Sequence, residues 1–209
     1  MYQSIQGEST FAGTPCTFIR LAGCPLNCLY CDTPQAIPTD SGSAFPVHEI
    51  IEKVRTFGHP LVLVTGGEPL AQRNVIELLK ALLKEAVTVQ LETAGAHDLG
   101  RVPDGVSIIM DIKTPGSGEA ARNRWENISH LKAGDEIKFV INDRDDYEWV
   151  KKVIRDRSLA ELKIPLLLSP AWKALPPATV AEWMLKDRLP MRLQIQQHKY
   201  IWGDEVTGV

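Results

Sequence analysis

The stretch Cys24-Pro25-Leu26-Asn27-Cys28-Leu29-Tyr30-Cys31 places three thiols within eight residues, spaced C-x3-C-x2-C. The one other cysteine, Cys16, lies upstream at the start of an apolar, strand-like run. A structural zinc site usually takes four closed ligands, whereas a [4Fe-4S] cluster held at three corners keeps one iron open. The triplet therefore favours a cluster with an open iron, and we expect Cys16 to be an ordinary core residue.

The residues alone leave two other uses of the triplet open. Zinc binding would make the chain a non-catalytic zinc-binding module. A disulfide would require an oxidising compartment, and three clustered thiols cannot all pair.

Length and charge narrow the class of protein. The chain has 209 residues, with 23 basic and 26 acidic side chains and a net charge of −3. This size suits a single domain spanning residues 1–209. The charge balance supplies no field that would favour nucleic acid or an anionic membrane, so we expect a small-molecule substrate. The sequence shows no membrane-spanning apolar run and no charged-then-apolar leader, which favours a cytoplasmic protein.

Short β-rich runs alternate with helical patterns, which is typical of parallel βα units. Apolar residues at 3, 4 spacing predict helices over His48–Phe57 and Val75–Leu83. The fold class is therefore α/β, a partial (incomplete) βα barrel with a mostly parallel sheet. The predicted strands are Cys16–Leu21, Leu61–Thr65, Val87–Leu91, Val106–Asp111, Glu136–Ile141, Ile164–Leu168 and Arg192–Gln196.

Polar motifs follow several of these strands, where barrels of this kind carry their chemistry. They are Thr65-Gly66-Gly67-Glu68-Pro69, Glu92-Thr93-Ala94-Gly95, Asp111-Ile112-Lys113 and Ser169-Pro170-Ala171-Trp172. Each alone reads as an ordinary turn or loop start. Their recurrence at one end of the sheet favours a shared site.

The cysteine spacing, with Tyr30 before the last thiol, resembles the radical S-adenosylmethionine (SAM) superfamily. The resemblance implies a [4Fe-4S] cluster on Cys24, Cys28 and Cys31, with SAM chelating the open iron. It also implies an external electron donor such as flavodoxin and formation of a 5′-deoxyadenosyl radical. The residues that the resemblance places around SAM are Tyr30, Cys31, Asp32, Gly67, Asp111, Ile112, Lys113 and Ser169.

Four separated motifs narrow the resemblance to the 7-carboxy-7-deazaguanine synthase family. They are Ser4-Ile5-Gln6-Gly7-Glu8, Phe18-Ile19-Arg20-Leu21-Ala22-Gly23-Cys24, Cys31-Asp32-Thr33 and Gln197-His198-Lys199-Tyr200-Ile201-Trp202. This family implies a lyase that contracts the ring of 6-carboxy-5,6,7,8-tetrahydropterin with loss of ammonia, on the route to queuosine. Magnesium and a homodimer are further implications.

Residue by residue, the resemblance puts the pterin on Ile5, Gln6, Gly7, Arg20 and Thr65, and magnesium on Thr33. The candidate catalytic side chains are Glu8, Arg20, Glu92 and His198. A guanidinium fork from Arg20 matches the 6-carboxylate of the substrate. The plain alternatives are an Arg20 paired with a surface acid and a His198 satisfied in the core.

The chain departs from the family pattern at its ends. Because it begins at Met1-Tyr2, we expect the strand that precedes the Ser4–Glu8 motif to be missing or reduced to a residue or two. In addition, Ser9 follows Glu8 at a position where glycine is common in the family. Some members bring the C-terminal carboxylate into the active site. That Val209 reaches the substrate is our hypothesis.

A rival enzyme class shares the cluster and the radical. Glycyl-radical activating enzymes are similarly small, have the same cysteine spacing and carry an Asp-x-Lys element like Asp111-Ile112-Lys113. They act on a backbone glycine of a protein. The Gln6-Gly7-Glu8 and His198-Lys199 segments favour the pterin.

Overall fold

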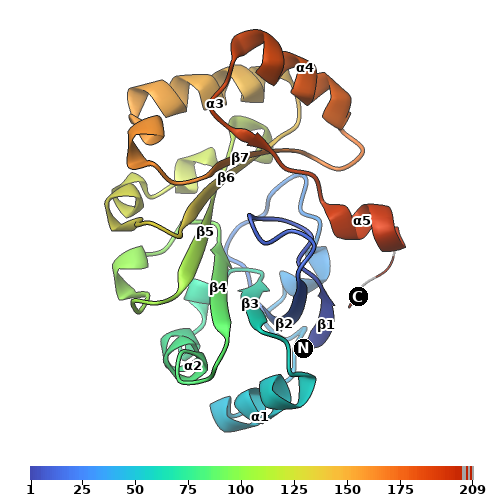
Figure 1. The fold of residues 1–209 in the computed structure, drawn as a ribbon, viewed down its shortest axis with the longest axis vertical. Helices are drawn as coiled ribbons and strands as arrows, with labels where there is room; N and C mark the ends of the chain where they lie inside the picture. The colour runs from blue at the N-terminus through green and yellow to red at the C-terminus, as the bar shows by residue number, and fades with distance from the viewer. Residues whose placement is uncertain (204–205, 207, 209) are drawn as a thin grey trace.

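The computed structural model describes residues 1–203, 206 and 208. Eight strands form one sheet in chain order, with β1 and β8 as its edges. The first pair, β1 and β2, is antiparallel, and the following pairs are parallel. The sheet curves without closing, which confirms the predicted partial βα barrel (Figure 1). The strands are β1 (Tyr2–Ile5), β2 (Pro15–Leu21), β3 (Leu61–Gly66), β4 (Thr88–Thr93), β5 (Ser107–Ile112), β6 (Glu136–Ile141), β7 (Leu166–Pro170) and β8 (Arg192–Leu193).

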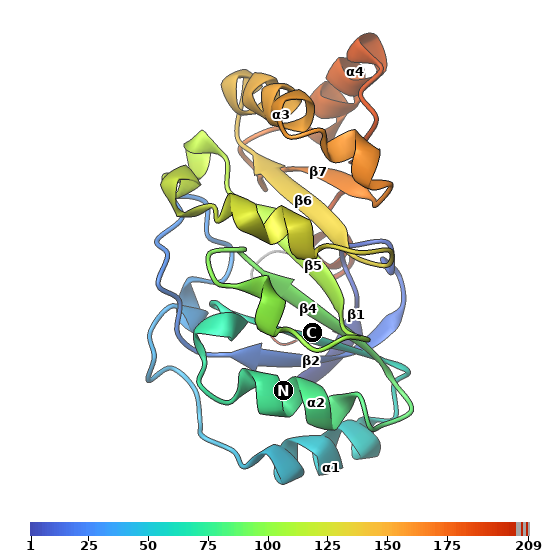
Figure 2. The same ribbon diagram turned by 90° about the vertical axis from the view of Figure 1, so that its left-hand side faces the viewer.

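Helical segments make the crossovers between the parallel strands, and Figure 2 shows α2 and α3 on the outer face of the sheet. The α-helices are α1 (Val47–Phe57), α2 (Val75–Leu82), α3 (Arg144–Asp156), α4 (Pro177–Asp187) and α5 (Gln197–Trp202). Short 3₁₀ helices are η1 (Pro34–Ala36), η2 (Pro69–Ala71), η3 (Leu99–Arg101), η4 (Pro115–Ser117), η5 (Ala120–Arg122), η6 (Trp125–His130) and η7 (Leu159–Leu162). None of the helices in the described part of the chain combines the length and apolar character that crossing a membrane requires.

The apolar run of β3 shows why the strands read as nearly continuous hydrophobic segments. Val62 and Val64 pack outward into the large core between the sheet and the helices. Leu61 and Leu63 point inward, where they form a smaller cluster with Cys16 and other side chains. Both faces of a parallel sheet are thus covered. Cys16 is fully buried, as predicted for an ordinary core residue.

Helix α3 begins at a side-chain cap. The side chain of Asp143 caps it by accepting a hydrogen bond of 2.9 Å from the backbone N–H of Asp146. Tyr147, Val150 and Ile154 then lie buried on one face of the helix. The cap and this apolar face fix α3 against the sheet beyond the end of β6.

Only two residues of β1, Tyr2 and Gln3, precede the Ser4–Glu8 motif, and the strand continues into the motif as far as Ile5 because Tyr2 to Ile5 pair with Phe18 to Pro15 of β2. Two other expectations, both about strand ends, are wrong. Strand β7 continues through Ser169 and Pro170, since these residues stay in register with Val140 and Ile141 of β6. Strand β8 is only two residues long, and the chain beyond it turns toward α5.

Candidate active site

One cavity of about 530 Å³ opens where the parallel strands end. It is lined by side chains from β1 to β6, from the cysteine segment and from the C-terminal segment. The predicted site residues on its wall are Ile5, Gln6, Gly7, Glu8, Arg20, Cys24, Cys28, Tyr30, Cys31, Asp32, Thr33, Thr65, Gly67, Glu92, Asp111, Lys113 and His198. The fold therefore gathers most of the residues that the sequence singled out from across the chain.

The cysteine segment is locked to the Gly66-Gly67-Glu68 turn by main-chain contacts. The N–H of Gly67 donates to the carbonyl of Leu21 at 2.9 Å, and the N–H of Glu68 donates to that of Gly23 at 2.9 Å. A Cβ on Gly67 would lie 2.4 Å from the Gly23 carbonyl oxygen. Glycine is thus required here for close approach of two backbones, in addition to any cofactor contact.

The other side of the cysteine segment rests on the chain after β5. The N–H of Leu29 donates to the carbonyl of Ser117 at 3.0 Å. The hydroxyl of Tyr30 donates to the carbonyl of Val140 at 3.0 Å. Held on both sides, the segment presents its three thiols to the cavity.

The thiols suit ligation by a cluster. Burial raises the pKa of Cys28 to about 11, and burial also raises the pKa of Cys24. Without a metal to stabilise the thiolates, these groups would stay protonated at neutral pH. Among the described residues, no three His, Cys, Asp or Glu side chains converge on a point that would hold one metal ion. Three thiols on the wall of one cavity fit a [4Fe-4S] cluster that takes one thiolate at each of three irons and leaves the fourth iron open.

Asp111 and Lys113 face the same cavity from β5 and the residue that follows it. Their Oδ2 and Nζ atoms are 2.9 Å apart. Burial opposes the charge of Lys113, but the neighbouring Asp111, Cys28 and Tyr30 together outweigh it and raise the pKa of the lysine. The Oδ1 atom of Asp111 is buried without a protein donor. An acceptor in this condition fits a bound group that brings N–H or O–H donors, as SAM does.

Ile112 lies between these two residues but points the other way. Its side chain belongs to the outer core and does not line the cavity, because successive residues of a strand face opposite sides of the sheet. The expectation that Ile112 surrounds the cofactor therefore has no side-chain support.

Glu68 is a buried residue next to the site to which sequence reasoning assigned no role of its own. Its Oε1 accepts from the N–H of Leu70 at 2.9 Å and from the hydroxyl of Thr93 at 2.8 Å. Its Oε2 accepts from the N–H of Ala94 at 2.8 Å. The fully buried carboxylate therefore joins the turn after β3 to the end of β4, directly behind the cavity wall.

Arg20 faces the opposite wall. Its Nη2 donates to the Tyr2 hydroxyl at 2.9 Å, and its Nη1 lies 3.4 Å from the hydroxyl oxygen of Thr33. Tyr2 in turn stacks on Phe18 with ring centroids 5.0 Å apart. No acidic side chain of the described residues forms an ion pair with Arg20. Within the described part of the chain, the hydrogen-bond partners of the guanidinium are thus two hydroxyl groups on the cavity wall.

The two chain ends meet beside this wall. The N–H of Gln197 donates to the carbonyl of Gly7 at 2.9 Å. Gln196, which sequence reasoning missed, donates through Nε2 to Glu8 at 2.9 Å and to Asp32 at 2.7 Å. His198 packs directly against Gly7, and burial lowers its pKa. The C-terminal motif is thus part of the site wall.

Lys138 is the third residue that sequence reasoning missed. Its Nζ bonds to Glu8 Oε2 at 2.8 Å, to Glu92 Oε1, and lies 3.7 Å from Asp111 Oδ2. A signal for it exists in the sequence: Glu136 and Lys138 alternate with apolar residues in a run otherwise typical of a strand covered on both faces. This period of two predicts polar groups on the inner face.

Two predicted residues remain, Ser169 and Val209. Ser169 is buried within β7 and does not line the cavity, because the strand continues past it; Ala171 and Trp172 of the same motif do line it. Val209 falls outside the described residues, so the structure does not test its proposed contact.

Comparison with known proteins agrees with this site. Residues 18–163 match the model of the radical SAM superfamily. The chain is 43% identical to the 7-carboxy-7-deazaguanine synthase of Chlorobaculum tepidum, covering 100% of this chain and 95% of the relative. It is 38% identical to the 7-carboxy-7-deazaguanine synthase of Koribacter versatilis, covering 100% and 98%.

Among solved structures, QueE from Escherichia coli superposes with a TM-score of 0.73 at 24% identity, covering 95% of this chain and 92% of that chain. This likeness shows a shared fold. Together with the full-length sequence identity, it places the cysteine segment and the cavity in a known context: the chain belongs to the radical SAM superfamily and, within it, to the 7-carboxy-7-deazaguanine synthase family.

Proposed function

We propose that this protein converts 6-carboxy-5,6,7,8-tetrahydropterin to 7-carboxy-7-deazaguanine with loss of ammonia, in the queuosine pathway. The observation that carries the proposal is one cavity lined both by the thiol triplet and by Arg20, with which no acidic side chain among the described residues forms an ion pair. The names of the full-length relatives support the same reaction.

At the thiol end, Cys24, Cys28 and Cys31 would hold the [4Fe-4S] cluster. When bound, the cluster and SAM supply the adenosyl radical that removes the hydrogen at C6 of the pterin. The chain itself orients the cofactor: Asp111 Oδ1 offers a buried acceptor, and Lys113 offers a cation beside it. The backbone of Gly67 forms the wall between them and the cysteine segment.

At the other end, Arg20 would bind the 6-carboxylate of the pterin through a two-pronged hydrogen bond. Tyr2 holds the fork in place through its hydroxyl. The hydroxyl of Thr33, close to Arg20, would help to bind Mg²⁺ together with water and the same carboxylate, since Mg²⁺ prefers oxygen ligands. Glu8, Glu92 and His198 would contact the ring system, with Thr65 and the Ile5–Gly7 backbone beneath it.

The test is an anaerobic assay of the reconstituted protein with the pterin, SAM, Mg²⁺ and a reductant such as reduced flavodoxin. We expect the deazaguanine product, and label from C6-deuterated substrate in the adenosyl group. A protein that holds its cluster and cleaves SAM under reduction, yet forms no product from the pterin, overturns the proposal. Label in 5′-deoxyadenosine from a protein glycine would instead indicate an activating enzyme.

Arg20 provides a sharper test of the substrate. Arg20→Ala should weaken pterin binding by about 2–5 kcal/mol, which is the scale of a buried charged pair that loses one partner. Iron content should stay unchanged, because Arg20 contacts none of the cysteines. Unaltered pterin affinity would contradict the assignment.

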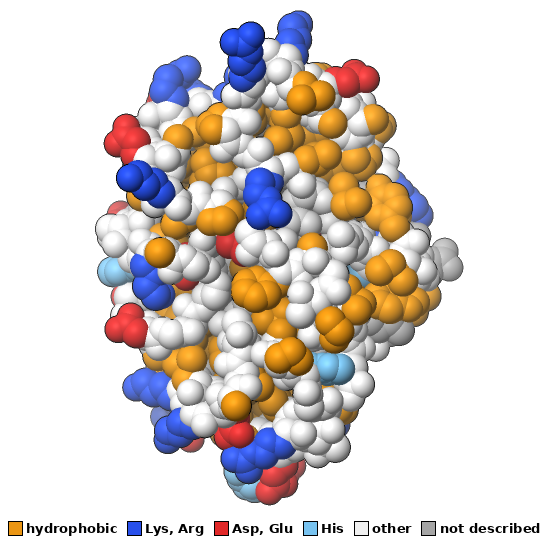
Figure 3. Space-filling model, viewed as in Figure 1, with side chains coloured by type: hydrophobic (Ala, Val, Ile, Leu, Met, Phe, Trp, Pro, Cys, Tyr) orange, Lys and Arg blue, Asp and Glu red, His pale blue; other side chains and the backbone are white. Residues whose placement is uncertain are grey.

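We further propose that the protein works in the cytoplasm as a homodimer. Figure 3 shows apolar side chains gathered on the face that carries α4 and α5. Exposed members on and near these helices include Leu185, Leu193, Tyr200, Ile201 and Trp202. Aromatic residues are enriched in interface cores. A monomeric mass from light scattering of the reconstituted protein would refute the dimer.

A further inference from the structure

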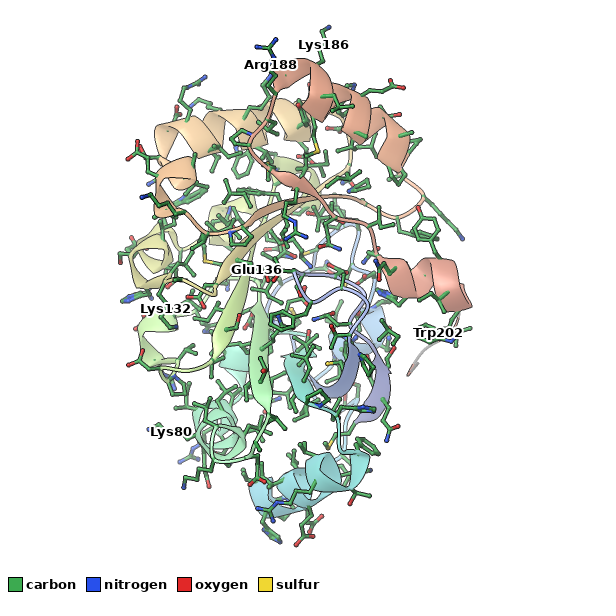
Figure 4. All side chains as sticks on the ribbon, in the orientation of Figure 1. Lys80, Lys132, Glu136, Lys186, Arg188 and Trp202 are labelled. Atoms are coloured by element: carbon green, nitrogen blue, oxygen red, sulfur yellow. The ribbon has the colours of Figure 1, made fainter. Side chains whose placement is uncertain are left out.

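Lys138 is a buried cation in the middle of the site. It lies on β6, is 5% exposed and points to the inner face of the sheet, as does Glu136, which Figure 4 places at the centre of the molecule. Glu136 is used structurally, since it accepts from the N–H of Thr10 at 3.1 Å. Lys138 instead lines the cavity.

Three carboxylates from three different elements share this one ammonium. Glu8 comes from the segment after β1, Glu92 from β4 and Asp111 from β5. The next charges around them are Lys113 beside Asp111, and Asp32, His198 and Lys199 beside Glu8. Burial opposes the charge of Glu8 and of Glu92. Without Lys138, Glu8 and Glu92 would face each other as two buried acids, and one would take up a proton.

The two glutamates differ in what they leave for a ligand. Both oxygens of Glu8 are used inside the protein, Oε2 by Lys138 and Oε1 by Gln196. Glu92 gives only Oε1 to Lys138, and within the described residues its Oε2 has no protein donor. The side chain of Glu92 is 24% exposed and lines the cavity. Its free oxygen is therefore presented to whatever the cavity binds.

We propose that Lys138 is a positioning residue that keeps Glu92 ionised and aimed, so that the free Oε2 accepts the N–H donors of a 2-aminopyrimidin-4-one ring. The inference rests on the proposed function and assigns the recognition of the pterin's amino-pyrimidinone half. Burial raises the pKa of Glu92 and the Glu8 charge raises it further, while Lys138 opposes both. Loss of this cation would thus favour the protonated acid, whose hydroxyl competes with those donors.

The experiment measures binding of 6-carboxypterin, a non-reactive probe, to the anaerobically reconstituted holoenzyme with SAM. Lys138→Met should weaken binding about 10- to 100-fold near neutral pH, the scale for buried N–H donors of the ligand that lose their acceptor. Binding should recover as the pH rises from about 6 to 9 and Glu92 ionises, whereas the wild type should stay flat. The matched control is Lys186→Met, an exposed lysine on α4 labelled in Figure 4, which should bind as the wild type does.

A double variant distinguishes an effect of Lys138 that acts through Glu92 from a general effect of Lys138 on the fold. Glu92→Gln alone should weaken binding, and adding Lys138→Met to it should cost less than about threefold more, because an amide needs no cation. Strictly additive effects, or a Lys138→Met protein that binds like the wild type with a full cluster, overturn the proposal. If Lys138→Met alone does not fold, the double variant must fold and bind like Glu92→Gln, and weaker binding overturns the proposal equally. A wild type that neither binds nor converts a pterin would refute the proposed function instead.

Discussion

Replacing Gly7 by alanine should disrupt pterin binding through one identified contact. The backbone of Gly7 lies outside the left-handed region, so alanine is allowed there by local geometry. The added Cβ, however, would lie 2.1 Å from Nδ1 of His198, where a real Cβ keeps at least 3.0 Å. The imidazole must therefore move back, and the Gly7–Gln197 hydrogen bond moves with it.

The magnitude follows from the overlap. Inserting a methyl group into a packed contact costs about 1–3 kcal/mol, which corresponds to about a 5- to 150-fold loss of affinity if the cost is borne in the bound state. Fluorescence titration with 6-carboxypterin measures this loss directly. Iron and sulfide content should be unchanged, since Gly7 contacts no cysteine.

The reasoning can be refuted by making Gly7→Ala in a protein that already carries His198→Ala. His198→Ala removes the ring and leaves only the Cβ, 3.2 Å from the alanine methyl. In that background Gly7→Ala should cost little. Wild-type affinity in the single variant, or an equal loss with and without the imidazole, would show that the contact does not act as described.

Three further predictions concern ligation, stability and pH. Cys28→Ala should lose cluster iron. Cys16→Ala should keep its iron and lose only about 1 kcal/mol of unfolding free energy, and loss of iron from this variant would contradict the ligand assignment. Glu68→Gln leaves at least one of three buried donors unpaired and should cost about 1–3 kcal/mol in chemical denaturation, while the exposed Glu49→Gln should be neutral. Burial lowers the pKa of His198, so the imidazole binds a proton more weakly in the folded protein than in the unfolded chain. The free energy of unfolding should therefore fall as the pH drops below about 6.5, where the unfolded chain takes up this proton. A His198→Gln variant with the same slope of stability against pH would exclude this source.

The features that the sequence determined are local ones. The C-x3-C-x2-C spacing holds three thiols together by covalent connectivity, whatever the rest of the chain does. The apolar runs locate the central strands because both faces of a parallel sheet must be covered, and the polar residues after them fall at one edge. Ile112 and Ser169 lie within β5 and β7 and do not line the cavity, because each strand continues into a motif that the sequence suggested to be a loop start.

Only the tertiary structure decided which polar groups meet. Lys138 and Glu8 are 130 residues apart, and Gln196 and Glu8 are 188 apart, so no local pattern pairs them. Strand β1 exists because β2 offers it hydrogen bonds, since its own short sequence carries little strand signal. Burial makes these contacts energetically important, because a buried charge is stable only beside a partner of opposite charge. The curvature of the sheet determines which charged residues lie close enough to pair.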